Sequence, residues 1–266
     1  MRLIVAACAI VAVCGIGCGD TKSPSPLQPA SPAQSSLSGD VQDTAFRGLS
    51  DARVEITEGA QAGAFATTEA YGLFRIPGVF SGTISVPASK DGYVTATQRL
   101  QVPTNQDLVF HLEAAGPSVD MTGVYTLTLL ADSTCTALPD IARKRTYQVA
   151  IGPNPRSPFL YEGILSGATF YQSHDFHFDI GVSGTTARLV IGEYGRGVTE
   201  DLGASTVEIW GQMDPSMNDS SSAGSFGGAF TYCNALPSTN WGTDFSCPVR
   251  PAYCEASNHQ FTLTRR

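Results

Sequence analysis

The sequence predicts an all-β protein with two folded domains. From residue 37 onward, short segments rich in β-branched and aromatic residues alternate with turns that contain Gly, Pro, Asp or Asn. Apart from one helical turn expected over residues 139–145, none of these segments has the apolar period of an amphipathic helix. The pair Gly116-Pro117 lies between two such β-rich regions and predicts a domain boundary within residues 115–120.

The first domain is expected to span residues 37–114. About seven short runs in it have strand-forming composition and are separated by turn residues. So many short strands in fewer than about 80 residues favour a small antiparallel sandwich. The expected strands cover residues 37–42, 52–57, 64–68, 72–76, 82–88, 93–102 and 106–112.

Several segments of this domain agree with one known family in order and spacing. They are Ser38-Gly39-Asp40-Val41, Gly48-Leu49-Ser50-Asp51-Ala52-Arg53-Val54, Thr67-Thr68-Glu69-Ala70-Tyr71-Gly72-Leu73-Phe74-Arg75-Ile76, Gly82-Thr83-Ile84-Ser85-Val86 and Lys90-Asp91-Gly92-Tyr93. These segments resemble the carboxypeptidase regulatory-like domain, a transthyretin-like sandwich of the carbohydrate-binding-like fold class. The resemblance implies a folding or docking accessory and does not imply peptidase activity. The segment Asp43-Thr44-Ala45-Phe46 departs from the Gly-bearing turn that is usual in the family.

The second domain is expected to span residues 121–266 and to contain about eight strands, each with one apolar face. Phe176, Phe178 and Ile180, for example, alternate with polar residues. Eight antiparallel strands fold either into a barrel or into a sandwich, and the sequence leaves both open. The opening Gly123-Val124-Tyr125 resembles that of lipocalin-like barrels, and a small apolar ligand inside such a barrel is one alternative function.

The N-terminus has the parts of a secretory signal. Arg2 precedes an uncharged apolar run over residues 3–17, and Cys18 follows it. The run is shorter than the about 20 residues that a membrane span needs. Gly15-Ile16-Gly17-Cys18 resembles a bacterial lipobox, with Gly15 where Leu is usual. We expect a signal peptide over residues 1–17 and a lipid on Cys18; an ordinary secreted protein is the alternative.

Residues 18–36 are expected to form a disordered, Ser/Pro-rich tether, because they contain almost nothing apolar to bury. At about 3.1 Å per residue, this tether would hold a folded body some tens of ångströms from a membrane. Gly19 rather than Asp follows the cysteine, which by the usual sorting rule of lipoproteins favours the outer membrane. The expected location is therefore the bacterial cell envelope, with the lipid anchor in the outer membrane.

The cysteine count is even once the N-terminal cysteines are set aside. Cys8 and Cys14 leave with the signal and Cys18 takes the lipid. Four cysteines in an oxidising compartment predict two disulfides, with three possible pairings. No Cys-x-x-Cys spacing is present, which disfavours the alternative of a zinc site. The remaining four are Cys135, Cys233, Cys247 and Cys254.

The charge balance argues against a nucleic-acid partner. Without residues 1–17 the chain keeps 24 acidic residues and loses Arg2 from its 16 basic ones, so its net charge falls from −8 to −9. Binding to a polyanion depends on clustered Lys and Arg. Arg143-Lys144-Arg145 is the only basic cluster in the sequence, and it is expected to be a solvated turn.

Two groups of polar residues are candidates for a metal site. Asp175, His177 and Asp179 alternate along one expected strand and therefore share a face. His and carboxylate ligands bind divalent metals, but one strand supplies only part of a coordination shell, so a solvated sheet face is the favoured interpretation. Asp214 and the pair Asn218-Asp219 lie in a Ser-rich segment without the EF-hand pattern, and a polar loop is expected there. No metal and no other cofactor is predicted.

No catalytic motif is complete. Ala223-Gly224-Ser225-Phe226-Gly227 is close to the Gly-x-Ser-x-Gly nucleophile elbow, which requires a strand, a sharp turn and a helix. Apolar alternation continues beyond this segment and predicts a strand instead. A hydrolase would need His174 or His177 beside a carboxylate and a nucleophile. The sequence therefore predicts a protein that is not an enzyme, with a hydrolase of unknown substrate as the disfavoured alternative.

Aromatic residues of the second domain are candidates for ligand binding, because their flat rings stack on sugars. The alternative for each of them is packing in the core. The leading prediction is a non-catalytic binding or accessory module for carbohydrate or protein, in which the carbohydrate suggestion comes from the fold-class resemblance alone. The candidates are Trp210, Trp241, Tyr161, Tyr171 and Tyr253.

Overall fold

The structure is a computed structural model of the whole chain. It describes residues 34–103, 107–155, 157, 160–170, 177–192, 197–217, 221–235, 247 and 249–266. Strands dominate these ranges and confirm the all-β prediction; the helical elements are a 3-10 turn, η1 (Ala70–Gly72), and one α-helical turn, α1 (Asp140–Arg143). No helix in these ranges is long and apolar enough to cross a membrane. The predicted signal peptide and Cys18 lie outside them.

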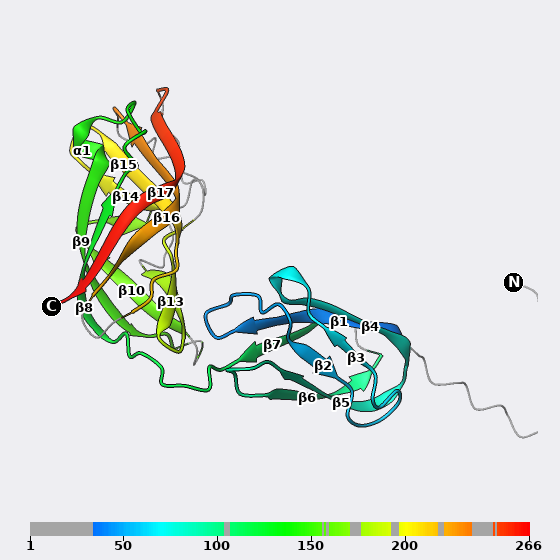
Figure 1. The fold of residues 1–266 in the computed structure, drawn as a ribbon. Coiled ribbons are helices and arrows are strands. Elements are labelled where there is room, and N and C mark those ends of the chain that lie inside the picture. The colour runs from blue at the N-terminus through cyan, green and yellow to red at the C-terminus, as the bar shows by residue number, and fades with distance from the viewer. Residues whose placement is uncertain are drawn as a thin grey trace, which may run out of the picture. The chain divides into compact units, whose positions relative to one another are not determined.

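The N-terminal domain is a sandwich of two sheets, as predicted (Figure 1). One sheet has the order β4-β1-β7 and the other has the order β3-β2-β5-β6. β1 pairs antiparallel with β4 and parallel with β7. The strands are β1 (Gln34–Asp43), β2 (Arg53–Glu55), β3 (Phe65–Thr67), β4 (Leu73–Phe80), β5 (Gly82–Ser89), β6 (Ala96–Val102) and β7 (Leu108–Leu112).

Alternating side chains of both sheets fill the space between them. Leu37 and Val41 of β1 are fully buried, as are Ile84 and Val86 of β5, which is the period-2 pattern of a half-buried strand. Burying these side chains stabilises the domain by about 2 kcal/mol each. β1 starts at Gln34, so the strand begins inside the range 18–36 that the sequence predicts as tether.

Gly72 makes the tight turn expected before β4. Its φ is 80°, and a Cβ on it would lie 2.1 Å from the carbonyl oxygen of Val41. A side chain at this position would clash with the backbone of β1, so only glycine fits here. The turn leads directly into Phe74 and Ile76, which face the core.

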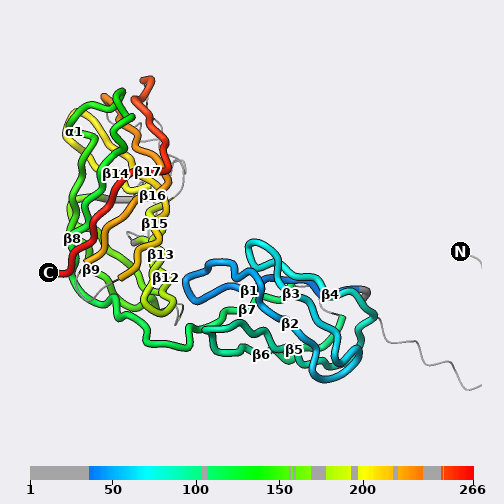
Figure 2. The backbone as a smooth tube through the Cα atoms, viewed as in Figure 1, coloured from blue at the N-terminus to red at the C-terminus, as the bar shows by residue number. Residues whose placement is uncertain are grey.

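The C-terminal domain is an eight-stranded antiparallel barrel, which decides between the two predicted architectures (Figures 1 and 2). The pairing order is β15-β13-β12-β10-β9-β8-β17-β16, and the β15–β16 pairing closes the ring. β14 and β11 extend the sheet beside β15. The strands are β8 (Gly123–Leu130), β9 (Lys144–Pro153), β10 (Leu160–Ser166), β11 (Thr169–Phe170), β12 (His177–Ser183), β13 (Thr186–Val190), β14 (Val198–Asp201), β15 (Thr206–Met213), β16 (Ser221–Cys233) and β17 (Ala252–Arg265).

Side chains fill the interior of the barrel. Phe178, Phe230 and Phe261 come from three different strands and are at most 3% exposed. They belong to one core cluster to which all eight barrel strands contribute side chains. A carrier of a small apolar ligand needs an empty interior at these positions, so the structure does not favour the lipocalin-like alternative.

Two disulfides hold one end of the barrel, as the cysteine count predicts, and the structure decides among the three possible pairings. Cys135, in the segment between β8 and α1, bonds Cys254 on β17 across a sequence separation of 119 residues. Cys233, the last residue of β16, bonds Cys247 across 14 residues. Every cysteine of the expected set is therefore paired.

Candidate functional site

The predicted metal ligands do not assemble into a site within the described part of the chain. Asp179 on β12 is exposed, and its Oδ1 lies 3.5 Å from Nδ2 of Asn154. The backbone of His177 belongs to β12 as well, whereas Asp175 lies outside the described residues. Among the residues described, no three His, Cys, Asp or Glu come close enough to hold a metal ion. Asp179 has the solvated position that the sequence favours.

Of the three residues expected in the polar loop, the structure describes Asp214. Its Oδ1 accepts a hydrogen bond from Nε of Arg188 at 2.8 Å, and its Oδ2 accepts one from Nε2 of Gln212 at 3.1 Å. The carboxylate therefore neutralises an arginine. The pair Asn218-Asp219, the other half of the calcium candidate, lies outside the described residues.

Ser225 is not a nucleophile elbow. It lies within β16, opposite Gln260 of β17, and the strand continues through it without a turn. His259 points instead into the barrel, where its ring is fully buried between Phe226 and Phe230. Ser225 and His259 thus lie on opposite faces of the sheet and cannot share a proton.

Among the aromatic candidates that the structure describes, Tyr161 and Trp210 lie in different surroundings. Tyr161 is partly buried against the barrel core and borders a hollow of about 390 Å³ beside Glu113 and Gly184. Trp210 on β15 is partly buried as well, but it does not line that hollow. Tyr171 and Trp241 lie outside the described residues.

A second hollow lies at the disulfide-linked end of the barrel and is the strongest candidate site. Its volume is about 410 Å³. One wall is the segment between β8 and α1, and the other is formed by the end of β16 and the start of β17. This barrel-end hollow is lined by Thr136, Ala137, Leu138, Pro139, Tyr232, Asn234, Arg250 and Ala252.

The walls of the barrel-end hollow are held by covalent and polar contacts. The Cys135–Cys254 disulfide joins one wall to the other, with the two Cα atoms 5.5 Å apart. Arg143 of α1 donates from Nε to the carbonyl of Leu138 at 3.0 Å and from NH2 to the carbonyl of Cys135 at 3.1 Å. Leu138 itself is buried. The hollow is therefore pre-formed, which lowers the entropic cost of binding a ligand.

The lining groups combine a ring, a cation and neutral polar groups. Tyr232 is partly buried, whereas Asn234, Arg250 and Thr136 are exposed and free to meet a ligand. An aromatic ring stacks on the apolar face of a sugar, and amide and guanidinium groups donate hydrogen bonds to its oxygens. None of the eight lining residues is an acid or a histidine, and the set supplies contacts for binding.

A partly buried polar cluster joins β9 to β14. Arg145 of β9 forms a two-pronged ion pair with Glu200 of β14, with Nε 2.7 Å from Oε2. The hydroxyl of Tyr147 donates to the same Oε2 at 3.0 Å. Glu200 raises the pKa of Arg145, and burial raises the pKa of Tyr147 far above its usual range. The cluster ties β9 to β14 and so helps to position this end of the barrel.

Sequence reasoning did not single out Tyr232, Asn234 or Arg250. One signal was available, because Tyr232 and Asn234 flank Cys233 and Ala252 lies two residues before Cys254. Side chains next to disulfide-bonded cysteines are held on a rigid frame, which is what a binding site requires.

Comparison with known proteins gives one match. Residues 36–114 match the family model of the carboxypeptidase regulatory-like domain. No curated protein and no solved structure shows significant similarity to the chain. The matched residues coincide with the seven-stranded sandwich, and the predicted resemblance is confirmed: the N-terminal part of this chain is similar to the carboxypeptidase regulatory-like domain.

Proposed function

We propose that the chain is a non-catalytic binding module of the bacterial envelope, and that the barrel-end hollow binds carbohydrate. The observation that carries the proposal is the lining of this hollow, where Tyr232, Asn234 and Arg250 converge between two disulfide-bonded walls. A pre-formed hollow with one aromatic ring and a few polar groups is the usual form of a small-ligand site.

The hydrogen-bonding groups of the hollow favour a saccharide that carries an acidic group. Arg250 offers a guanidinium, which pairs with carboxylates in a two-pronged geometry. The eight lining residues contain no opposing carboxylate. A ligand with both hydroxyls and one carboxylate would therefore use every polar group of the hollow.

The N-terminal domain supports an accessory role for the chain. Its family match is to a regulatory-like domain, and its sandwich has a core of its own. Export and lipid attachment at Cys18 would place both domains outside the cytoplasm, where the two disulfides persist. The membrane is then a partner through the lipid anchor, and the length of the tether sets how far the domains can extend from the membrane.

A glycan array that includes uronic-acid saccharides tests the proposed function. The probe protein is the chain starting at Gly19, and hits are titrated by calorimetry. Arg250→Ala is expected to weaken binding about tenfold or more, because it removes a charged hydrogen bond. Arg99→Ala is the matched control, since Arg99 is exposed on β6 of the other domain.

Two results would contradict the proposal. One is an array without any hit, and the other is equal weakening of binding by Arg250→Ala and Arg99→Ala. Loss of binding in Asn234→Ala, with unchanged thermal unfolding, would locate the ligand at the barrel-end hollow independently of charge.

A further inference from the structure

The last residue of β1 and the first two residues of the turn that follows it are buried, although turns normally lie in solvent. Asp43 is 1% exposed, Thr44 6% and Ala45 0%. The residues that cover this turn belong to the barrel, at the hairpin between β12 and β13. We call residues 43–47 the docking loop and residues 181–188 the barrel hairpin.

The docking loop is shaped by hydrogen bonds within itself. Oδ1 of Asp43 accepts hydrogen bonds from the backbone N–H of Ala45 at 2.8 Å and of Arg47 at 3.0 Å. Oδ2 of Asp43 accepts one from Nε of Arg47 at 2.8 Å. These bonds hold the backbone around Phe46, whose φ of 60° is unfavourable for an aromatic residue. The loop therefore stores strain that a simple Gly-bearing turn would avoid.

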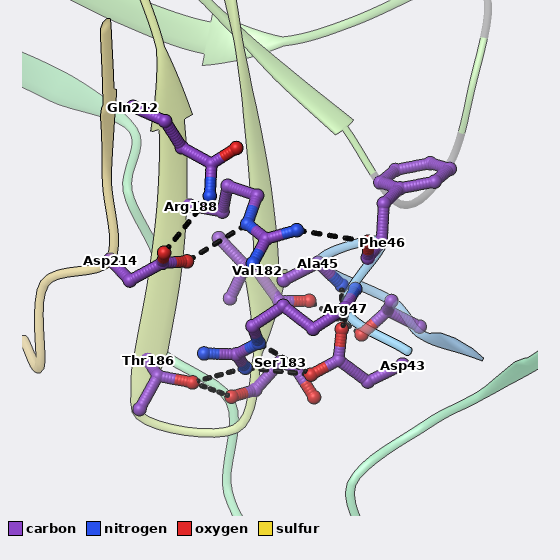
Figure 3. A network of polar contacts seen from close by, with 11 residues as sticks. Asp43, Ala45, Phe46, Arg47, Val182, Ser183, Thr186, Arg188, Gln212 and Asp214 are labelled. Atoms are coloured by element: carbon purple, nitrogen blue, oxygen red, sulfur yellow. Dashed lines mark hydrogen bonds and ion pairs between the residues drawn. The ribbon is translucent and has the colours of Figure 1, made fainter. Parts of the chain in front are cut away.

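Three hydrogen bonds join the docking loop to the barrel (Figure 3). The hydroxyl of Thr44 donates to the carbonyl of Val182 at 2.5 Å. Nη2 of Arg47 donates to the hydroxyl oxygen of Thr186 at 2.5 Å. The hydroxyl of Thr186 in turn donates to the carbonyl of Ser183 at 2.9 Å.

Arg188 makes the third bond, from NH1 to the carbonyl of Phe46 at 3.0 Å. Figure 3 shows its guanidinium between Asp214 on one side and Phe46 on the other. The ion pair with Asp214, at 2.8 Å, fixes the direction of Arg188. The barrel thus presents an oriented donor to the docking loop.

The backbones also fit closely at this contact. A Cβ on Gly181 would lie 2.7 Å from the Cα of Ala45. The backbone of Ala45 cannot move aside as a flexible side chain would, because it lies in the turn held by Asp43. Glycine at position 181 is therefore what lets Ala45 approach the barrel wall.

We propose that the docking loop fixes the sandwich to the barrel, so that the two domains move as one rigid body. The partner surface is the barrel hairpin of the same chain. The arrangement explains why Asp43-Thr44-Ala45-Phe46 departs from a simple Gly-bearing turn: each of these residues supplies a group that shapes or makes the contact. The inference is independent of what the barrel-end hollow binds.

Distance measurement between two spin labels tests this inference on the full chain. Thr67→Cys in the sandwich and Gln148→Cys in the barrel place labels on exposed strand positions, and the native cysteines of the barrel are paired. The expected result is one narrow distance distribution. Gly181→Leu should broaden it, because the side chain would separate Ala45 from the barrel wall.

The control is Gly152→Leu, since a Cβ at Gly152 meets nothing within 4 Å. This variant should keep the narrow distribution. If Gly181→Leu does not fold, the double variant Arg47→Ala/Arg188→Ala removes two of the three bonds without adding volume and should broaden the distribution instead. A broad distribution in the labelled chain without further substitutions overturns the inference. So does a narrow distribution in a folded Gly181→Leu variant.

Discussion

His259 shows how a titratable side chain is held neutral inside the barrel. Its Nδ1 accepts a hydrogen bond from the backbone N–H of Asp132 at 3.0 Å, and its Nε2 lies 3.1 Å from the carbonyl of Gly228. A neutral ring with its proton on Nε2 satisfies both partners. Burial lowers the pKa of His259 below its usual value of 6.5. Protonation would remove the acceptor that Asp132 needs and place a charge in the core.

A loss of stability in mild acid follows from this geometry. In the unfolded chain the pKa of His259 is 6.5. Below this pH, the unfolded chain binds more protons at His259 than the folded chain does. The free energy of unfolding should therefore fall as the pH drops from about 7.5 to 5.5, by about 1.4 kcal/mol for each pKa unit of separation. Urea unfolding of the chain and of His259→Gln measures the difference. An imidazole of His259 that titrates at or above 6.5 by NMR contradicts the prediction.

Loss of the charge on Glu200 is predicted to lower the free energy of unfolding more than loss of the charge on an exposed carboxylate that also pairs with an arginine. Glu200→Gln leaves the guanidinium of Arg145 partly buried without a counter-charge, so it should lower the free energy of unfolding by about 2 kcal/mol. The matched control is Glu55→Gln, because Glu55 pairs with Arg53 on an exposed surface. Such a pair contributes less than about 1 kcal/mol. Equal losses in the two variants, measured by urea unfolding, would show that the barrel cluster is not a stabilising unit.

For single residues, the sequence predicts which side chains face the core, but it does not predict which polar side chains contact one another. Alternation alone places Tyr147 and Val149 on one face of a strand. Nothing in the chain indicates that Arg145 pairs with Glu200, 55 residues later, because that contact depends on the curvature of the closed barrel. The same holds for Tyr232 and Arg250, which are 18 residues apart in the sequence and both line the barrel-end hollow.

At the scale of elements, apolar alternation predicts the long strands well. All seven strands of the sandwich and the one helical turn occur near their expected positions. β14 (Val198–Asp201) was not predicted, because its four residues are too few to show a period. The sequence predicts the last strand over residues 260–264, whereas β17 begins eight residues earlier, at Ala252. The disulfide of Cys254 and the pairing with β16 hold these earlier residues in the strand, although their strand propensity is weak.

The sequence also does not determine whether the C-terminal domain forms a barrel or a sandwich. It depends on the pairing of β15 with β16, from Thr206↔Cys233 to Gln212↔Gly227, which closes the ring. Each strand has the same alternation in either architecture. The closing pair is set by how strands far apart in the chain curve towards one another.

The two disulfides should differ in their contribution to stability. The Cys135–Cys254 bond spans 119 residues and the Cys233–Cys247 bond spans 14. In the chain-entropy view a longer loop stabilises more, which gives about 5 kcal/mol for the first and about 3 kcal/mol for the second. Thermal unfolding of Cys135→Ser/Cys254→Ser and of Cys233→Ser/Cys247→Ser compares them. A larger loss from the short loop would contradict the prediction.

At the scale of the molecule, two different β domains share one chain. The sequence predicts both domains and the Gly-Pro boundary between them. It does not predict the docking loop, because a departure from a family turn shows only that the turn is unusual. The contacts of Thr44 and Arg47 with the barrel hairpin give that departure a physical reason.

We propose that the chain is exported, anchored by lipid at Cys18 and oxidised outside the cytoplasm. Intact-mass analysis of the protein isolated from bacterial membranes tests it most directly. The account predicts a chain that starts at an acylated Cys18 and has four fewer hydrogen atoms than its reduced form, because two disulfides are present. A full-length chain without acyl groups and with free thiols would contradict it.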